Sequence, residues 1–258
     1  MEGIEKIRDL ALKAAKQAGK VLLKHYGKVK SIKAKDNLSY VSNVDLESEK
    51  CIISAIRKTY PEHDIISEES GRLNKKSDYI WHIDPLDGTH NYINNIPLFG
   101  VSIALEYKGK IILGVINLPY FNELYFAEKG KGAFLNGKHI KVSNKKDLKK
   151  SFIAVDLVLR HNPEKKIKFL KKLEGHVHDL RVLGSAVAAV AYVARGSADL
   201  YLVQQTNSWD ISAGFLLIEE AGGKVTGFNG NNWNPYMDNF IASNKILHNG
   251  ILKVFNKN

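Results

Sequence analysis

Two aspartates three residues apart define the segment with the clearest chemical potential, Asp84-Pro85-Leu86-Asp87-Gly88-Thr89. Carboxylates on either side of a proline-restrained turn can converge on one point. Gly88 allows the backbone to approach a ligand closely, and Thr89 with the following amides can form a helix N-terminus suited to an anion. The two carboxylates and the Leu86 carbonyl are hard oxygen donors, which favour Mg²⁺ over Zn²⁺. Taken alone, the segment is equally compatible with a solvated aspartate turn that caps a helix.

Other acidic residues occur where they could join this segment. Glu68-Glu69-Ser70 follows a short apolar run, residues 64–67, which we interpret as a strand. Residues 79–83 lead into Asp84 and are interpreted as a second strand, which could lie beside the first. Farther along, Ser208-Trp209-Asp210 begins an apolar helix, where an aspartate by itself is typical of an ordinary N-cap. The hypothesis is that these carboxylates meet at one sheet edge.

Converging carboxylates are unfavourable in the absence of a cation. Two of them about 4 Å apart repel by roughly 4 kcal/mol at an effective dielectric constant near 20. Three or four at one point would be hard to tolerate unless divalent metal ions neutralised them. The acidic residues are therefore a candidate metal site.

The elements that must position these residues are of mixed type. Apolar residues recur at helical spacing over residues 4–26, and a second helix fits 46–60, where Pro61 follows. The chain then becomes rich in strands, whereas its last hundred residues alternate strands and helices. We expect one half at residues 1–145, carrying the Glu-Glu and Asp-Pro-Leu-Asp-Gly-Thr motifs, and a second at 146–258, carrying Trp209-Asp210.

The composition indicates a globular protein of a reducing compartment. The chain has 258 residues, of which 44% are hydrophobic and 25% charged. Cys51 is the only cysteine, which excludes an internal disulfide and a cysteine-based zinc site. The first residues lack the pattern of a signal peptide, and the longest uncharged apolar run, Ala186 to Ala194, is far shorter than the about 20 residues that cross a bilayer. We expect a cytoplasmic protein with no membrane partner.

The net charge of +11 raises the question of a nucleic-acid partner. The basic residues are mostly lysines spread along the whole chain, and their short clusters carry no interleaved aromatic residues for base stacking. A lysine-rich solvated surface that attracts anionic metabolites is therefore the preferred interpretation, and nucleic-acid binding as the primary role is not expected.

Several motifs together resemble one known family. They are Glu68-Glu69-Ser70, Trp81-His82-Ile83 leading into Asp84, Lys129-Gly130-Lys131-Gly132-Ala133 with Asn136-Gly137, Gly184-Ser185-Ala186, Trp209-Asp210 and Glu220-Ala221-Gly222-Gly223. In this order and spacing, over nearly the whole chain, they resemble the inositol monophosphatase family, which shares its fold with the fructose-1,6-bisphosphatases. The resemblance implies an α+β fold with five layers, an α-β-α-β-α sandwich, and a homodimer.

The resemblance also implies two or three Mg²⁺ ions per active site. Glu68, Asp84 and the Leu86 carbonyl would hold the first ion. Asp84, Asp87 and Asp210 would hold the second.

Catalytic roles follow from the same resemblance. Glu68 and Thr89 would orient the attacking water, while Asp45 would support Thr89 and a weaker third metal position. The residues that would bind the substrate are Asp87, Gly88, Thr89, Gly184, Ser185, Ala186 and Asp210.

The implied reaction is hydrolysis of a small polyol or sugar phosphate by metal-activated water that attacks in line, without a covalent phosphoenzyme. Inositol 1-phosphate is the first candidate substrate. Two positions depart from the inositol-specific pattern: Ser39 stands where members often carry Asp, and Val203 stands where animal-type members carry a Glu that contacts inositol hydroxyls. Because valine cannot accept those hydrogen bonds, fructose 1,6-bisphosphate is an alternative or additional substrate.

Two other classes compete with this interpretation. Haloacid-dehalogenase-type phosphatases place two aspartates two residues apart, whereas Asp84 and Asp87 are three apart. A basic nucleic-acid- or partner-binding protein on a phosphatase scaffold is the non-enzymatic alternative, although every metal-ligand position is filled. His82 and His90 flank the motif without metal-ligand spacing, so packing or surface roles are expected for both.

Overall fold

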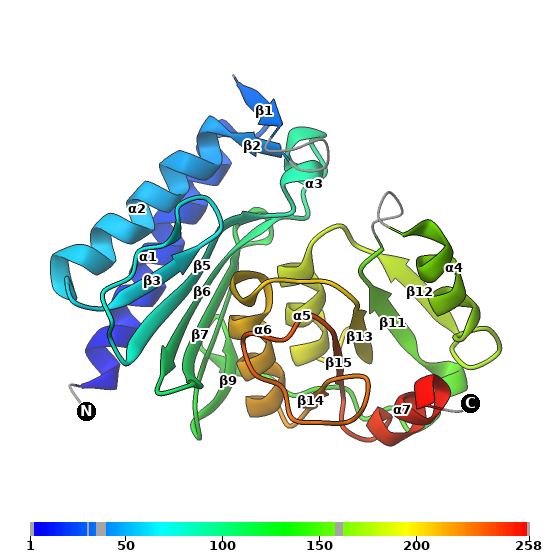
Figure 1. Ribbon diagram of the computed structural model, residues 1–258. Coiled ribbons are helices and arrows are strands. Elements are labelled where there is room, and N and C mark those ends of the chain that lie inside the picture. The colour runs from blue at the N-terminus through cyan, green and yellow to red at the C-terminus, as the bar shows by residue number, and fades with distance from the viewer. Residues whose placement is uncertain (1–2, 30, 35–39, 158–161, 257–258) are drawn as a thin grey trace.

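The computed structural model describes residues 3–29, 31–34, 40–157 and 162–256, which form five stacked layers (Figure 1). Two helices cover one face of a large sheet, two more lie between this sheet and a smaller one, and a last pair covers the far face of the smaller sheet. In this order the pairs are α1 (Ile4–His25) with α2 (Asn43–Thr59), α5 (Ala186–Ala194) with α6 (Ser208–Glu220), and α4 (Pro163–Lys171) with α7 (His248–Asn256). The predicted α-β-α-β-α sandwich is confirmed.

The large sheet has eight strands in the described part of the chain, in the order β10-β9-β8-β7-β6-β5-β3-β4. Along the chain these are β3 (Asp64–Ser67), β4 (Gly71–Arg72), β5 (Tyr79–Asp87), β6 (Gly100–Tyr107), β7 (Lys110–Leu118), β8 (Glu123–Glu128), β9 (Gly132–Leu135) and β10 (Lys138–His139). β3 and β5 pair in parallel, and the other neighbours are antiparallel. The parallel pairing brings the carboxyl ends of β3 and β5 to the same edge, as the acidic motifs after them suggested.

The smaller sheet has five described strands in the order β12-β11-β13-β15-β14. They are β11 (Phe152–Val155), β12 (Asp179–Val182), β13 (Leu200–Val203), β14 (Lys224–Thr226) and β15 (Phe240–Ser243). The described chain is completed by a short β1 (Ile32–Ala34) and β2 (Tyr40–Ser42) pair, helix α3 (Thr89–Ile93) and two single 3₁₀ turns at Pro119–Phe121 and Leu148–Lys150.

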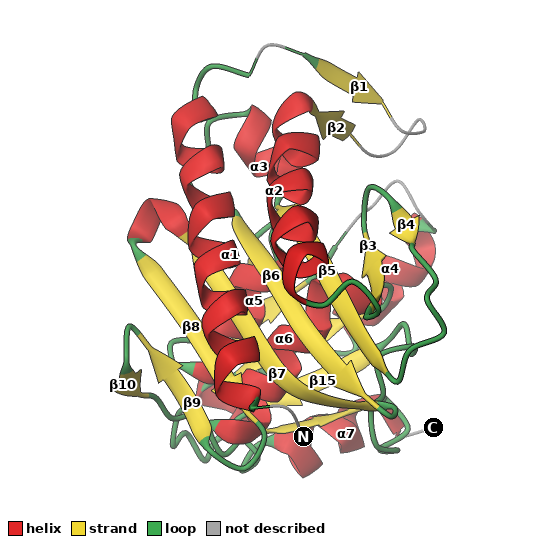
Figure 2. Ribbon diagram, turned by 90° about the vertical axis from the view of Figure 1, so that its left-hand side faces the viewer, coloured by secondary structure: helices red, strands yellow, loops and turns green. Residues whose placement is uncertain are grey.

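Helices α1 and α2 lie side by side across the outer face of the large sheet (Figure 2). α1 buries Ile7, Ala11, Ala14 and Leu22, which recur at helical spacing against that face. α2 begins at Asn43, three residues earlier than predicted. The reason is a capping box: the Ser42 hydroxyl accepts from the Val44 amide at 3.1 Å, and the Asp45 carboxylate accepts from the Ser42 amide at 2.8 Å.

Strand β5 runs through the aspartate motif, whereas the sequence predicted a strand that ends at Ile83. In its antiparallel register with β6, Asp84 faces Ser102 and Asp87 faces Gly100. Three steps along β5 therefore match two steps along β6. The extra residue makes a bulge, which lets both aspartates point to the same side of the sheet.

The middle helices pack very closely on the large sheet. A Cβ atom at Gly114 of β7 would lie 2.6 Å from the Ala213 carbonyl oxygen of α6, and one at Gly214 would lie 2.0 Å from a Val190 methyl of α5. Both glycines are thus required by close approach of backbones and side chains. This packing fixes how α6, which carries Asp210, sits against the sheet that carries Asp84.

The large sheet lies within residues 64–139 and the small sheet within 152–243. The division into halves at residue 145 stays a prediction. In the described chain, no helix combines the length and apolar character needed to cross a bilayer.

Candidate active site

Three aspartates meet where the large sheet faces α6. Asp84 and Asp87 come from β5, and Asp210 comes from the first turn of α6. One carboxylate oxygen of each lies within 4.8 Å of the others, and Asp84 is only 1% exposed. The sequence predicted this convergence, and the structure brings the three residues together.

The electrostatics of the three carboxylates show that their charge is not neutralised by the protein. Burial, with the nearby charges of Glu68 and Asp87, raises the pKa of Asp84 well above its usual value. Burial also raises the pKa of Asp87 and of Asp210 to about 7, with further contributions from Asp210 on Asp87 and from Glu68 on Asp210. The cluster carries more acid than its own donors can stabilise.

Asp87 is held by the N-terminus of α5. Its carboxylate accepts the Ser185 hydroxyl, the Ala186 amide at 3.2 Å and the Val187 amide at 3.1 Å. A helix N-terminus stabilises a carboxylate through these amides. The segment that the sequence predicted to line the substrate therefore also grips a metal-ligand candidate, which the sequence analysis missed.

Asp210 is fixed within its own turn. Its carboxylate accepts the Asn207 amide at 3.0 Å and the Thr206 hydroxyl at 3.1 Å. The first bond belongs to a capping box that begins α6. Asp210 therefore has both the capping role that the sequence analysis gave as the ordinary interpretation and a place in the acidic cluster. Both of these hydrogen bonds go to its Oδ2, which leaves Oδ1 for the cluster.

Thr89 lies between two of the other predicted residues. Its hydroxyl lies 3.0 Å from the Leu86 carbonyl and 3.4 Å from an Asp45 carboxylate oxygen. Burial raises the pKa of Asp45, and the charge of Glu68 acts in the same direction. Gly88, in the left-handed region at φ 78°, precedes α3 with Thr89 as the first helical residue.

Glu68 approaches the cluster from the neighbouring strand. Its amide donates to the Ile83 carbonyl at 3.1 Å, which places Glu68 next to Asp84 across the β3–β5 pair. It is not one of the three residues whose oxygens converge. Its effect on the pKa values of Asp84 and Asp210 nevertheless shows that its charge acts on them.

A cavity of about 360 Å³ opens beside the cluster. Predicted residues on its wall are Asp87, Gly184, Ser185, Ala186 and Asp210. The sequence analysis expected only a packing or surface role for His90, which lines the cavity, and it missed Asp156, Leu157, Val182, Gln205 and Thr206. Asp156 follows the end of β11, so an acid directly after a buried strand was the signal that could have found it.

The two positions that depart from the inositol pattern give different outcomes. Val203 is fully buried in the apolar core between the sheets and does not line the cavity. Its side chain therefore has no access to a ligand there. Ser39 lies outside the described residues.

The donor set fits a hard divalent cation. The converging atoms of Asp84, Asp87 and Asp210 are all carboxylate oxygens, and no histidine or cysteine belongs to this group. Oxygen donors and uncompensated negative charge are what Mg²⁺ requires, whereas zinc prefers nitrogen and sulfur. A bound cation would also favour the ionised form of these carboxylates, and so oppose the effect of burial on their pKa values.

Comparison with known proteins agrees with the geometry. The model of the inositol monophosphatase family matches residues 4–258. A fructose-1,6-bisphosphatase/inositol-1-monophosphatase of Thermotoga maritima is 36% identical over 250 residues, covering 96% of this chain and 95% of the relative. A Nus factor SuhB of Pasteurella multocida is 41% identical over 227 residues, covering 86% and 85%.

Solved structures give the same result. The extragenic suppressor protein suhB of Bartonella henselae superposes with a TM-score of 0.92 at 35% identity, covering 98% of this chain and 99% of that one. An inositol monophosphatase of Anabaena superposes with a TM-score of 0.88 at 33% identity, covering 97% and 95%. With its five layers and its acidic cluster between the large sheet and α6, the chain belongs to the inositol monophosphatase family of metal-dependent phosphatases.

Proposed function

We propose that this protein is a Mg²⁺-dependent phosphomonoesterase for a small polyol or sugar phosphate, with inositol 1-phosphate as the first candidate. The observation that carries the proposal is the convergence of Asp84, Asp87 and Asp210, whose pKa values are raised, beside a cavity of about 360 Å³ that Asp87 and Asp210 line. Carboxyl groups gathered in this way lower the stability of the folded protein unless a cation is bound.

Two ions, or three, would use the oxygen atoms around the cluster. Glu68, Asp84 and the Leu86 carbonyl would hold one; Asp84, Asp87 and Asp210 would hold another. A weaker third position would lie near Asp45 at the edge of the site. When bound, Mg²⁺ supplies neutralisation of the phosphate charge, a lower pKa for water and stabilisation of the departing alkoxide.

The chain's own groups would orient the reactants. The Thr89 hydroxyl and the Glu68 carboxylate would accept hydrogen bonds from the attacking water and so orient it. Asp45 would fix the rotamer of Thr89 through the 3.4 Å contact between the Asp45 carboxylate and the Thr89 hydroxyl. The Gly88 and Thr89 amides, at the start of α3, would receive phosphate oxygens. Gly184, Ser185 and Ala186 would line the alcohol portion of the substrate.

The substrate alcohol would meet a polar wall. Asp156 and Gln205 line the cavity and can accept hydrogen bonds from ring hydroxyls, which Val203 cannot do. These groups support a polyol monophosphate. The name of the Thermotoga maritima relative, fructose-1,6-bisphosphatase/inositol-1-monophosphatase, supports fructose 1,6-bisphosphate as the alternative or an additional substrate.

Phosphate release tests this proposal. The purified chain is assayed with and without Mg²⁺ on inositol 1-phosphate, fructose 1,6-bisphosphate, NADP and adenosine 3′,5′-bisphosphate. We expect turnover that requires Mg²⁺ and is fastest with inositol 1-phosphate. A faster reaction with fructose 1,6-bisphosphate would support the alternative, and no metal-dependent release from any of them would refute the enzyme proposal.

A second candidate function is favoured by one finding: several relatives, including one that is 41% identical, carry the name Nus factor SuhB. With a net charge of +11, the chain could bind nucleic acid or a protein partner on the phosphatase scaffold. RNA affinity that falls steeply with salt, in a protein without hydrolytic activity, would favour this candidate.

We also infer a homodimer located in the cytoplasm. The molar mass measured by light scattering during size-exclusion chromatography tests the homodimer. The position of a fluorescent fusion in cells tests the cytoplasmic location. A mass equal to one chain of 28.9 kDa would refute the dimer.

A further inference from the structure

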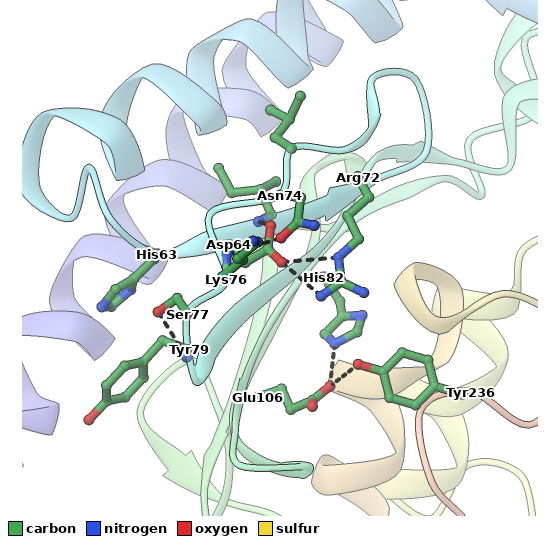
Figure 3. A network of polar contacts seen from close by, with 12 residues as sticks. His63, Asp64, Arg72, Asn74, Lys76, Ser77, Tyr79, His82, Glu106 and Tyr236 are labelled. Carbon is green, nitrogen blue, oxygen red and sulfur yellow. Dashed lines mark hydrogen bonds and ion pairs between the residues drawn. The ribbon is translucent and has the colours of Figure 1, made fainter.

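A buried histidine joins the strand of the metal motif to the helix that carries Asp210. His82 is fully buried in β5, and Figure 3 shows the contact of one of its ring nitrogens with Glu106. Its other ring nitrogen contacts Ser208 of α6. Nε2 lies 2.9 Å from a Glu106 carboxylate oxygen, and Nδ1 lies 2.9 Å from the Ser208 hydroxyl. The Tyr236 hydroxyl donates to the same Glu106 oxygen at 2.9 Å.

The network fixes which nitrogen of His82 carries its proton. Although burial favours the neutral acid, the hydrogen bonds from His82 and Tyr236 lower the pKa of Glu106, so this carboxyl group is ionised. A carboxylate only accepts hydrogen bonds, so His82 Nε2 must donate. In the neutral ring, Nδ1 is then the acceptor for the Ser208 hydroxyl.

The position of His82 gives this contact a consequence for the metal site. Side chains two apart on a strand point to the same face, so His82 and Asp84 both face α6. Ser208 is the first residue of α6 and precedes Asp210 by two. A second tether supports the same turn: the Ser102 hydroxyl of β6 donates to the Trp209 carbonyl at 3.0 Å.

We propose that His82 is a positioning residue which, through Ser208, holds the first turn of α6 against β5 so that Asp210 stays within reach of Asp84 for shared binding of Mg²⁺. The inference rests on the proposed function of the acidic cluster. When both are ionised, the carboxylates of Asp84 and Asp210 repel one another before a cation binds. The His82–Ser208 contact opposes this repulsion by joining the same two elements, so the ligands are preorganised.

The chain offers a matched control. His248 is also fully buried, and its ring nitrogens bond to two hydroxyls, Thr226 at 2.9 Å and Ser243 at 2.7 Å. It joins α7 to strands β14 and β15, and both of its ring nitrogens are occupied by partners outside the cluster. Variants of this histidine lose the same chemistry without touching the metal site.

The test compares Ser208→Ala with Ser243→Ala, and His82→Leu with His248→Leu. Mg²⁺ binding is measured by calorimetry on the full chain. Mg²⁺-dependent turnover and the unfolding temperature without Mg²⁺ are measured in parallel. We expect about 10-fold weaker Mg²⁺ binding in Ser208→Ala and His82→Leu, the lower end of the effect of removing a group that orients a metal ligand. Saturating Mg²⁺ should restore most of kcat.

The control variants should unfold at lower temperature but keep the wild-type Mg²⁺ affinity. The double variant His82→Leu/Ser208→Ala should bind Mg²⁺ no more weakly than His82→Leu, because both changes remove one contact. If His82→Leu does not fold, Ser208→Ala against Ser243→Ala decides alone. Wild-type affinity in folded Ser208→Ala would overturn the proposal, as would an equal loss in Ser243→Ala. A wild-type chain that bound no Mg²⁺ would overturn the proposed function as well, which distinguishes the two failures.

Discussion

Two groups of carboxylates lie where the large sheet meets α6, and they behave in opposite ways. In the cluster of Asp84, Asp87 and Asp210, the acids face one another, and their pKa values are raised. Glu106, four residues after Ser102 on β6, faces the donors His82 and Tyr236, and its pKa is lowered. Burial acts to raise the pKa in both groups, so burial alone does not decide the charge state.

The difference teaches what separates a structural carboxylate from a metal ligand. Asp87 accepts three hydrogen bonds from the start of α5, yet its pKa is still raised to about 7. Hydrogen-bond donors thus outweigh the effect of burial on the pKa of Glu106. They do not outweigh it for Asp87, whose pKa is also raised by the charge of Asp210. A carboxyl group whose pKa stays raised although it accepts several hydrogen bonds is one whose ionised form a bound cation can stabilise.

The largest expected effect comes from removing one charge of the cluster. Asp84→Asn or Asp210→Asn should lower Mg²⁺-dependent turnover by about 10³-fold or more, because the charge that balances the cation is lost. The metal-free protein should at the same time become more stable, since folding no longer has to protonate, or bury in charged form, a carboxyl group whose pKa is raised by burial and acidic neighbours. Phosphate release and thermal unfolding check the two halves of this prediction. Substantial activity in either variant would refute the ligand assignment.

The second prediction concerns pH. Asp87 and Asp210 have a pKa of about 7 in the folded metal-free protein, whereas carboxylates of an unfolded chain titrate near about 4. The folded state therefore binds more protons in this window, and the two groups make the metal-free protein less stable as pH rises from about 4 to about 7, by at most about 1.4 kcal/mol per pH unit for each group.

Mg²⁺ should cancel that loss, so the stabilisation by Mg²⁺ should grow between these pH values. Asp84, whose pKa is raised well above its usual value, acts in the same direction. Denaturant unfolding with and without Mg²⁺ measures it. His248, whose pKa burial lowers to about 4, adds an opposite slope, but it contributes equally in both conditions and disappears in the difference. A Mg²⁺ effect that did not change with pH would contradict the raised pKa values.

The third prediction is a loss of stability, opposite to the gain expected for Asp84→Asn in the absence of Mg²⁺. Glu106→Gln removes a carboxylate whose neighbours are donors, so the protein should lose about 1–3 kcal/mol of unfolding free energy. Asp84→Asn and Glu106→Gln, measured side by side by urea denaturation without Mg²⁺, should therefore shift the midpoint in opposite directions. Shifts in the same direction would break the comparison between the two groups.

The smallest expected effect belongs to Tyr236→Phe. The change removes one hydrogen bond to Glu106 at a side chain that is 59% exposed, so the cost should be about 1 kcal/mol or less. Calorimetry should show a decrease of about 2–4 °C in unfolding temperature at most. An unchanged Mg²⁺ affinity is expected, because His82 keeps its contact with Ser208. A larger loss of affinity than in Ser208→Ala would move the centre of the tether to Tyr236.

The sequence by itself determined the family, the layered fold and the acidic positions. Asp84-Pro85-Leu86-Asp87-Gly88-Thr89 is a local signal, because strand, proline and glycine act over a few neighbouring residues. The start of α2 and the extent of β5 were predicted less well. Each depends on a contact that residue pattern alone does not specify: a capping box at Ser42, and a bulge opposite Gly100 of β6.

Only the tertiary structure decided how the acidic positions are held. The hydrogen bond from Ser185 to Asp87 and the contact of His82 with Ser208 join residues 98 and 126 positions apart. Nothing local to His82 distinguishes it from an ordinary packing residue, and packing or surface was the role predicted for it. Hydrogen bonds between distant elements depend on how layers stack, and the stacking is fixed by the close packing of the whole core.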